Sequence, residues 1–301
     1  MKDLIERIGR LKDERHALIL AHLYQPAEVQ EIADRVGDSL ELARYAVTTE
    51  AEVIVLAGVR FMAESAKLLN PGRTVLLPAE GAGCPMADMI DDQTLRSLKA
   101  EHPRAVVVCY VNSTAAVKAE SDICCTSSNA LKVVQSIPQD REIIFVPDRN
   151  LGGYAAEQSG RQLILYPGYC PTHQRLLPEM VVAIRKEHPG APFMAHPECT
   201  AEVRGMADLV GSTAQIIEAC RTRPEKEFII ATENGILHGL GKVRPDARFF
   251  PVSETHGICP NMKKTTLELI RSALETNRHE IRIPEGIAER ARLPLERMLA
   301  L

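Results

Sequence analysis

Three of the eight cysteines precede a proline, and their spacing along the chain is nearly regular. They are Cys84, Cys170 and Cys259, which are separated by 86 and 89 residues. With 8 Cys and 19 Pro among 301 residues, chance would give roughly half of one such pair. No Cys-x-x-Cys pair is present, which weighs against a zinc ribbon or a thioredoxin-type redox site. The spacing instead predicts an internal repeat with one thiol in each copy.

A pair of polar residues follows an apolar run at the same place in each repeat. The runs cover residues 17–21, 105–109 and 191–195, and short continuous runs of this kind are typical of parallel strands buried on both faces. The two polar residues stand two positions apart, which puts both on one face of a continuing strand. The pairs are His22 and Tyr24, Tyr110 and Asn112, and His196 and Glu198.

Hydroxyl residues precede a helical pattern in each repeat. They are Ser39, Ser127 and the adjacent Ser212 and Thr213, and we expect each repeat to use one as a helix N-cap. Helix N-termini favour anions, so the same residues are candidates for binding carboxylate or phosphate groups. We expect His22 and His196 to add hydrogen bonds or positive charge. Glu198 is the one carboxylate among the strand-end pairs and is the predicted general base.

The remaining apolar runs complete each repeat. Second strands are predicted at 53–56, 143–146 and 228–231, and third strands at 75–77, 163–165 and 249–250. Strands that alternate with helices indicate parallel α/β layers. The predicted fold is therefore α/β, with three pseudo-threefold-related three-layer α/β/α domains around a central cavity. The domains are 1–102 with an N-terminal amphipathic helix, 103–188, and 189–301 with a C-terminal helix and a tail broken at Pro284 and Pro294.

This architecture predicts where a ligand would bind. Open parallel sheets bind ligands at the carboxyl ends of their strands, so three such sheets about one axis would face a shared cavity. The three Cys-Pro thiols would converge there and could hold a metal. A structural zinc wants four ligands, and a fourth is not evident. A cubane iron–sulfur cluster held by three thiolates would keep one iron open as a Lewis acid, which favours the cluster.

Composition excludes several classes of function. The 36 Lys and Arg against 40 Asp and Glu give a net charge of −4, and the chain has no Trp. We therefore expect no nucleic-acid partner and no binding to acidic membranes. No apolar run approaches the roughly 18 residues of a membrane span, and the first residues mix charges where a signal peptide is apolar. We expect a cytoplasmic protein with a small-molecule substrate.

The motifs taken together resemble the quinolinate synthase family over nearly the whole chain. They are Ala21–Gln25, Gly37–Leu40, Val59–Glu64, Tyr110–Asn112, Cys124–Asn129, His196–Cys199 and the three Cys-Pro sites. The resemblance implies a [4Fe–4S] cluster held by Cys84, Cys170 and Cys259. It also implies condensation of iminoaspartate with dihydroxyacetone phosphate to quinolinate, a precursor of NAD, with loss of phosphate and two waters. An aspartate-oxidising enzyme would supply the iminoaspartate.

The resemblance also implies a set of site residues. The catalytic residues would be Glu198, Tyr24, His22 and Tyr110. The substrate shell would comprise His22, Ser39, Tyr110, Val111, Asn112, Ser127, His196, Pro197, Glu198, Ser212 and Thr213. Some family members carry a Cys-x-x-Cys redox pair near the C-terminus. None follows Cys259 here, so a disulfide switch of that kind is not expected.

Two alternatives stay open from the sequence. Diphthamide-forming enzymes share the plan of three domains and three cysteines, but they cleave S-adenosylmethionine at their cluster. The polar strand-end pairs favour a small polyanionic substrate over that chemistry. The second alternative is a non-enzymatic scaffold or sensor that is stabilised by bound zinc or an iron–sulfur cluster. The other five cysteines lie in or beside apolar runs and are interpreted as buried thiols.

Overall fold

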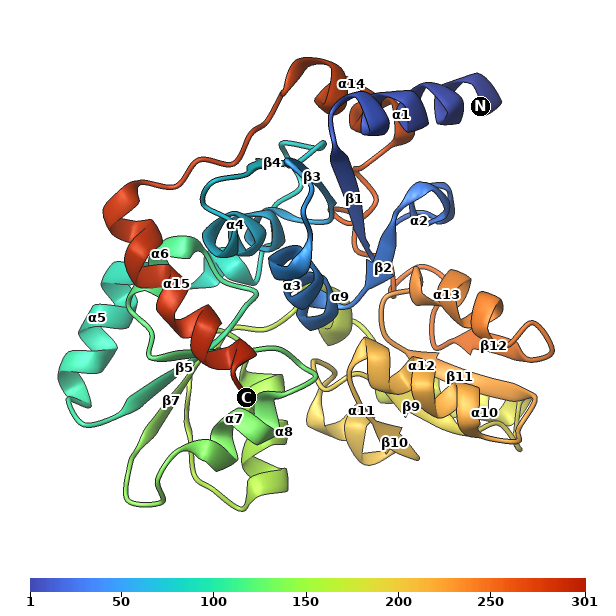
Figure 1. The fold of residues 1–301 in the computed structure, drawn as a ribbon. Helices are drawn as coiled ribbons and strands as arrows, with labels where there is room; N and C mark the ends of the chain where they lie inside the picture. The colour runs from blue at the N-terminus through green and yellow to red at the C-terminus, as the bar shows by residue number, and fades with distance from the viewer.

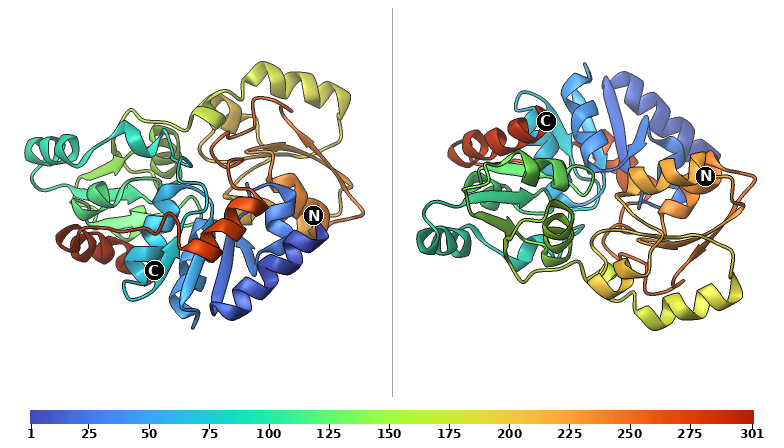
Figure 2. Two further views of the ribbon diagram at one scale, coloured as in Figure 1. Left: turned by 90° about the horizontal axis from the view of Figure 1, so that it is seen from above. Right: turned by 90° about the horizontal axis from the view of Figure 1, so that it is seen from below.

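The computed structural model describes residues 1–301 and contains three four-stranded sheets. All strand pairs are parallel, and the orders are β2-β1-β3-β4, β6-β5-β7-β8 and β10-β9-β11-β12. The three sheets thus share one topology, and helices flank each of them (Figure 1). Viewed from above and below, they form three lobes around the centre of the molecule (Figure 2). The predicted α/β class with three α/β/α domains is confirmed. The domain boundaries remain predictions.

The strands of the first sheet are β1 (Ala17–His22), β2 (Arg35–Gly37), β3 (Val53–Ala57) and β4 (Thr74–Leu76). Those of the second are β5 (Val106–Tyr110), β6 (Ile123–Cys125), β7 (Ile143–Val146) and β8 (Ile164–Leu165). Those of the third are β9 (Phe193–Ala195), β10 (Leu209–Val210), β11 (Glu227–Ala231) and β12 (Arg248–Pro251).

The helices up to the end of the second sheet are α1 (Lys2–Glu14), α2 (Ala27–Ile32), α3 (Ser39–Thr48), α4 (Arg60–Leu69), the 3-10 turn Ala87–Met89, α5 (Asp92–Glu101), α6 (Ala115–Ala119), α7 (Ala130–Ser136) and α8 (Arg149–Ser159). Those that follow are α9 (Pro171–Gln174), α10 (Pro178–Glu187), α11 (Ala201–Gly205), α12 (Thr213–Thr222), α13 (Ile236–Val243), α14 (Leu267–Thr276) and α15 (Glu285–Leu299). No helix combines the length and the apolar character needed to cross a membrane.

The central strands are buried on both faces, as the continuous apolar runs predicted. All five residues of β3 and all four of β7 are buried, with no alternation between polar and apolar positions. One hydrophobic core includes side chains from all three sheets, such as Leu20, Val108 and Ile230. The three repeats are therefore packed against one another, which is consistent with the lack of a linker between them.

Each sheet has a short edge strand that the sequence analysis did not predict. These strands, β2, β6 and β10, have only two or three residues, too few for a periodic pattern. An aspartate precedes each one at a position that the repeats share. Its Oδ2 accepts a hydrogen bond from the backbone N–H fifteen residues earlier, at the start of the first strand. The pairs are Asp34 with Ile19 (2.8 Å), Asp122 with Val107 (2.8 Å) and Asp208 with Phe193 (2.7 Å).

These aspartates tie the start of each edge strand to the neighbouring strand, so they are expected to contribute to stability. Replacement of Asp122 by alanine leaves the N–H of Val107 without this acceptor and should cost about 1–2 kcal/mol. The melting temperature should fall by roughly 1–3 °C in a chain of this size. Asp140→Ala is the matched control, because Asp140 is exposed and forms no side-chain hydrogen bond. Equal melting temperatures for the two variants would contradict this role.

The C-terminal segment differs from the predicted broken tail. Residues Glu285–Leu299 form α15, with Pro284 at its N-cap and Pro294 inside the helix. A proline inside a helix removes one backbone hydrogen bond, so the sequence alone favoured a break. Pro294 and Leu295 are buried, however, and α15 packs against α6 and α4 (Figure 1). This burial compensates for the lost bond, because tertiary packing supplies most helical stability.

Candidate active site

The carboxyl ends of the strands face one shared cavity of about 190 Å³. A cysteine from each repeat lines it, and so do polar residues from each first strand and each helix start. The sequence-predicted residues in its lining are His22, Tyr24, Ser39, Cys84, Tyr110, Asn112, Ser127, Cys170, His196, Glu198, Thr213 and Cys259. Three others, Val111, Pro197 and Ser212, lie beside these but do not line the cavity. The structure therefore brings most of the predicted set together, while the roles of the individual residues remain predictions.

The helix starts differ in detail from the expected serine caps. Only Ser212 is an N-cap, and it accepts a hydrogen bond from the N–H of Gln215. Helix α3 is capped by Asp38, whose carboxylate accepts from the N–H groups of Leu40 and Glu41, both at 2.9 Å. A carboxylate accepts more bonds than a hydroxyl and suits the positive end of the helix.

The hydroxyl residues themselves take other positions. Ser39 and Thr213 are the first residues of α3 and α12 and line the cavity directly. Ser127 also lines the cavity but precedes α7 by three residues, and Asn129 occupies the N-cap position there. The N-termini of α3 and α12 therefore lie at the cavity, where the positive ends of the two helices favour an anion.

Glu198, in the third repeat, is held between donors from the second repeat. Its Oε1 accepts a hydrogen bond of 2.6 Å from the Tyr110 hydroxyl, and the Asn112 amide nitrogen lies 3.4 Å away. Its Oε2 lies 2.7 Å from Nδ1 of His173. Burial alone would raise the pKa of Glu198, but the neighbouring imidazoles and Tyr110 lower it to about 2. The side chain is therefore a buried carboxylate that accepts hydrogen bonds.

His22 and His196 are neutral donors rather than positive charges. Burial lowers the pKa of His22 to about 4 and that of His196 to about 3. Nδ1 of each ring accepts a hydrogen bond from the backbone N–H two residues later, at 3.1 Å from Tyr24 and 3.3 Å from Glu198. A neutral ring with an accepting Nδ1 carries its proton on Nε2. Each ring therefore offers one N–H to a ligand, and burial favours hydrogen bonding over positive charge as the contribution of these two residues.

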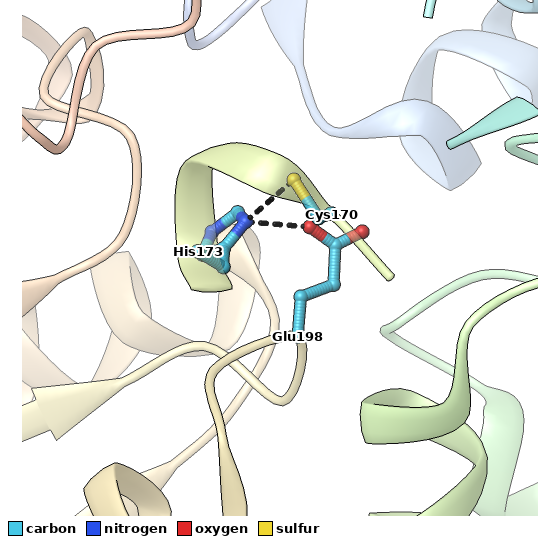
Figure 3. A group of neighbouring side chains, drawn as sticks. All are labelled: Cys170, His173 and Glu198. Carbon is cyan, nitrogen blue, oxygen red and sulfur yellow. Dashed lines mark hydrogen bonds and ion pairs between the residues drawn. The ribbon is translucent and has the colours of Figure 1, made fainter. Parts of the chain in front are cut away.

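His173 is a cavity residue that the sequence analysis missed. Its Nδ1 faces both Cys170 Sγ, at 3.1 Å, and Glu198 (Figure 3), and its Nε2 lies 2.9 Å from the Thr232 hydroxyl. The other repeats have no histidine at this place, because the residues three after Cys84 and Cys259 are Ala87 and Met262. A histidine present in one repeat only could not stand out when the repeats are compared. Its place one turn after a Cys-Pro pair was the available signal.

Tyr24 joins the first repeat to the third. Its hydroxyl shares hydrogen bonds with Thr213 at 3.1 Å and Thr232 at 2.6 Å. Burial and the charge of Glu198 raise the pKa of Tyr24 well above its usual value, so the phenol keeps its proton. Tyr24 is therefore a rigidly held proton-bearing group at the wall of the cavity.

The three cysteine thiols fit a metal centre in their chemistry and placement. They are free thiols, one from each repeat, in the lining of one cavity. Burial raises the pKa of Cys84 to about 12 and that of Cys170 well above its usual value, so thiolates there need a bound cation. Glu233, which is buried, accepts a hydrogen bond from the Cys259 N–H at 3.0 Å and pairs with Lys263 at 2.9 Å. That pair anchors the third thiol loop and was also missed from the sequence.

A second set of donor atoms lies beside these thiols. Cys170, His173 and Glu198 each offer one atom that can ligate a metal, and these atoms lie within 4.8 Å of one another. Cys170 thus belongs to both sets. Soft thiolate ligands together with imidazole are typical of zinc and iron sites. The residues present therefore fit a metal cofactor held at the thiol end of the cavity.

Three parallel α/β repeats that share one cavity, with a thiol from each repeat and donors suited to anions, define a class of pseudo-threefold α/β proteins with a central cavity that can hold a metal. Residues 6–300 match the family described as Quinolinate synthetase A protein. The chain belongs to this family, so the resemblance found in the sequence is confirmed and the chain is an enzyme.

Relatives from three organisms show how complete the similarity is. The chain is 53% identical over 298 residues to quinolinate synthase of Methanoregula boonei, with 99% of this chain and 98% of the relative covered. It is 52% identical to quinolinate synthase of Desulforudis audaxviator, with 99% and 98% covered. It is 53% identical to quinolinate synthase of Geobacter metallireducens, with 98% and 97% covered. The similarity thus extends over all three repeats.

Proposed function

We propose that this enzyme condenses iminoaspartate with dihydroxyacetone phosphate to form quinolinate, a precursor in NAD biosynthesis. The two substrates supply all seven carbons of quinolinate, and one phosphate and two water molecules are released. The observation that carries the proposal is the meeting of three thiols with neutral N–H donors and helix N-termini in one cavity. A dicarboxylate and a phosphate ester need such donors.

The proposed cofactor is a [4Fe–4S] cluster held by Cys84, Cys170 and Cys259. When bound through three thiolates, such a cluster keeps one iron open, and that iron can act as a Lewis acid toward substrate oxygens. One thiol from each repeat suits a single group on the pseudo-threefold axis. Because burial raises the pKa of Cys84, a thiolate at this position would need a bound cation to compensate its charge.

The proposed substrate contacts divide by chemistry. Ser39, Ser127 and Thr213, near the helix starts, would bind anionic groups, while His22 and His196 would each donate Nε2–H to a carboxylate or phosphate oxygen. The side-chain oxygen of Asn112 is buried without a hydrogen-bond partner, so it is free to accept from a ligand. The remaining members of the proposed substrate shell are Val111, Pro197 and Ser212, which lie beside these residues and do not line the cavity.

The proposed proton transfers centre on Glu198. Its neighbours lower the pKa of Glu198, and Tyr110 and His173 hold its two oxygens at 2.6 and 2.7 Å. Protons can therefore pass within this hydrogen-bonded group. Tyr24 and His22 lie beside it in the lining and are the further candidates for acid–base work.

Partners follow from the substrates. Iminoaspartate is the two-electron oxidation product of aspartate and hydrolyses in water, so we propose that an aspartate-oxidising enzyme supplies it. The expectations of no nucleic-acid partner and of a cytoplasmic location remain predictions from sequence.

The test is an anaerobic assay in which quinolinate is identified by its mass. Protein with its metal content measured is incubated with both substrates, and omission of either substrate is the control. Quinolinate formed only with both substrates present is the expected result. No product from protein with a full cluster would overturn the proposed reaction. Cleavage of S-adenosylmethionine in a parallel reaction would then favour the diphthamide-type alternative, and no turnover of either kind would favour the scaffold.

A further inference from the structure

A buried polar side chain stands at the same place in all three repeats, directly behind the strand-end residues. The short helices α2, α6 and α11 each follow the first strand of a sheet. The fourth residue of each helix is Gln30, Lys118 or Arg204, which are 3%, 0% and 6% exposed. Buried lysine and arginine side chains are rare unless paired, so their presence here calls for a physical reason.

The three side chains make the same pair of hydrogen bonds. Each donates to the backbone carbonyls seven and five residues earlier in the chain. Gln30 Nε2 donates to Leu23 at 3.0 Å and to Gln25 at 2.9 Å. Lys118 Nζ donates to Val111 at 2.7 Å and, at short range, to Ser113. Arg204 Nη1 donates to Cys199 at 2.7 Å and, more weakly, to Pro197 at 3.5 Å.

The residues whose carbonyls are held alternate with the residues that line the cavity. Leu23 and Gln25 alternate with His22 and Tyr24, and the same order recurs in the other two repeats. These residues form a tight turn or bend after each first strand: the Gln25 N–H donates to the His22 carbonyl and the Cys199 N–H to the His196 carbonyl, both at 2.9 Å. A donor that holds two carbonyls of such a turn fixes its backbone, and with it the direction of the side chains between them.

The charges of the three donors differ while the bonds stay the same. Lys118 forms no ion pair with a carboxylate, and its Nζ lies 5.8 Å from the centre of the Phe61 ring. Arg204 pairs with Glu157 at 3.1 Å, and Gln30 is neutral. Because a neutral amide does the same work in the first repeat, the shared requirement is the donor geometry and not the charge.

We propose that Gln30, Lys118 and Arg204 are positioning residues that hold the three substrate-binding loops in register around the cavity. The inference rests on the proposed function of those loops. It predicts that the donor groups can be exchanged between repeats, and that loss of the donor frees one loop without unfolding the others.

Lys118 offers the sharpest test, because glutamine already fills the equivalent place in the first repeat. Lys118→Met removes the donor but keeps the length and bulk of the side chain. It should lower kcat/KM roughly 10–100-fold, as expected for loss of buried hydrogen bonds. It should also speed amide hydrogen exchange in residues 110–114 but not in 22–26 or 196–200. Lys118→Gln should stay within a few-fold of wild type in both measurements. Lys186→Met, at an exposed position, is the matched control.

Gln30→Met is the second variant, since it removes no charge and is expected to fold. It should speed hydrogen exchange in residues 22–26 only. Equal behaviour of the methionine and glutamine variants at position 118 would overturn the proposal, because charge or bulk would then be the cause. So would reduced activity with unchanged loop exchange, which indicates a merely structural role. Hydrogen exchange can be measured without turnover. Failure of this inference can therefore be distinguished from failure of the proposed reaction in the wild-type protein.

Discussion

Replacement of Cys170 by alanine is expected to abolish quinolinate formation and to remove most of the bound iron. Cys170 is one of three thiols in the cavity and lies 3.1 Å from His173, so its loss also removes a neighbour of the Glu198 group. A cubane cluster depends on its thiolate ligands, and two thiols from two repeats cannot replace the third. Iron and sulfide content, measured anaerobically, should fall from about four of each per chain, and activity should fall below detection.

The matched control is Cys220→Ala. Cys220 is a fully buried thiol of α12 that packs in the hydrophobic core and does not line the cavity. This variant should keep its iron and its activity, although the lost sulfur should reduce stability slightly. Full iron content in Cys170→Ala would exclude Cys170 as a ligand. Retained activity without iron would remove the cluster from the reaction altogether.

Replacement of Glu198 by glutamine is expected to lower kcat roughly 10²–10⁴-fold while the iron content stays unchanged. Glutamine has the same shape and can still accept a hydrogen bond from Tyr110, but it carries no charge and cannot take up a proton. The group facing His173 Nδ1 at 2.7 Å would no longer be a carboxylate. The expected loss therefore reports proton transfer rather than misplacement of Tyr110.

Glu218→Gln, at an exposed position on α12, is the control for the amide substitution and should leave kcat unchanged. A kcat of Glu198→Gln within a few-fold of wild type would exclude Glu198 from proton transfer. Loss of iron from this variant would have a different meaning. It would assign Glu198, with Cys170 and His173, to the metal centre, since their donor atoms lie within 4.8 Å of one another.

Much of the fold could be predicted from residue patterns. Runs such as 53–56 and 143–146 are apolar without interruption because the sheets are covered on both faces. The edge strands were missed because two or three residues are too few to show a period. Helix α15 was missed because Pro294 favours a break locally, and only burial against α6 and α4 compensates.

Part of the candidate site could also be predicted from residue patterns. Residues that recur in all three repeats, such as the Cys-Pro thiols, were found by comparing the repeats. His173 has no counterpart at the matched positions and was missed. Glu233 is matched by an acidic residue only in the second repeat, at Asp148, and was also missed. Asp38 caps α3 instead of the expected Ser39, because the Asp38 side chain reaches the N–H groups of Leu40 and Glu41. Residue types alone do not reveal the distances between these atoms.

The amino-acid sequence by itself determined the repeat, the order of strands and helices, and the loops that carry the thiols and polar pairs. These properties depend on neighbours in the chain and on burial, which residue type reflects directly. Only the tertiary structure decided which polar atoms meet: Glu198 with Tyr110 and His173, and Lys118 with the carbonyls behind its loop. It also decided that His22 and His196 are neutral. Hydrogen bonds and desolvation act over a few ångströms, and such proximity between distant residues exists only after the three repeats have packed together.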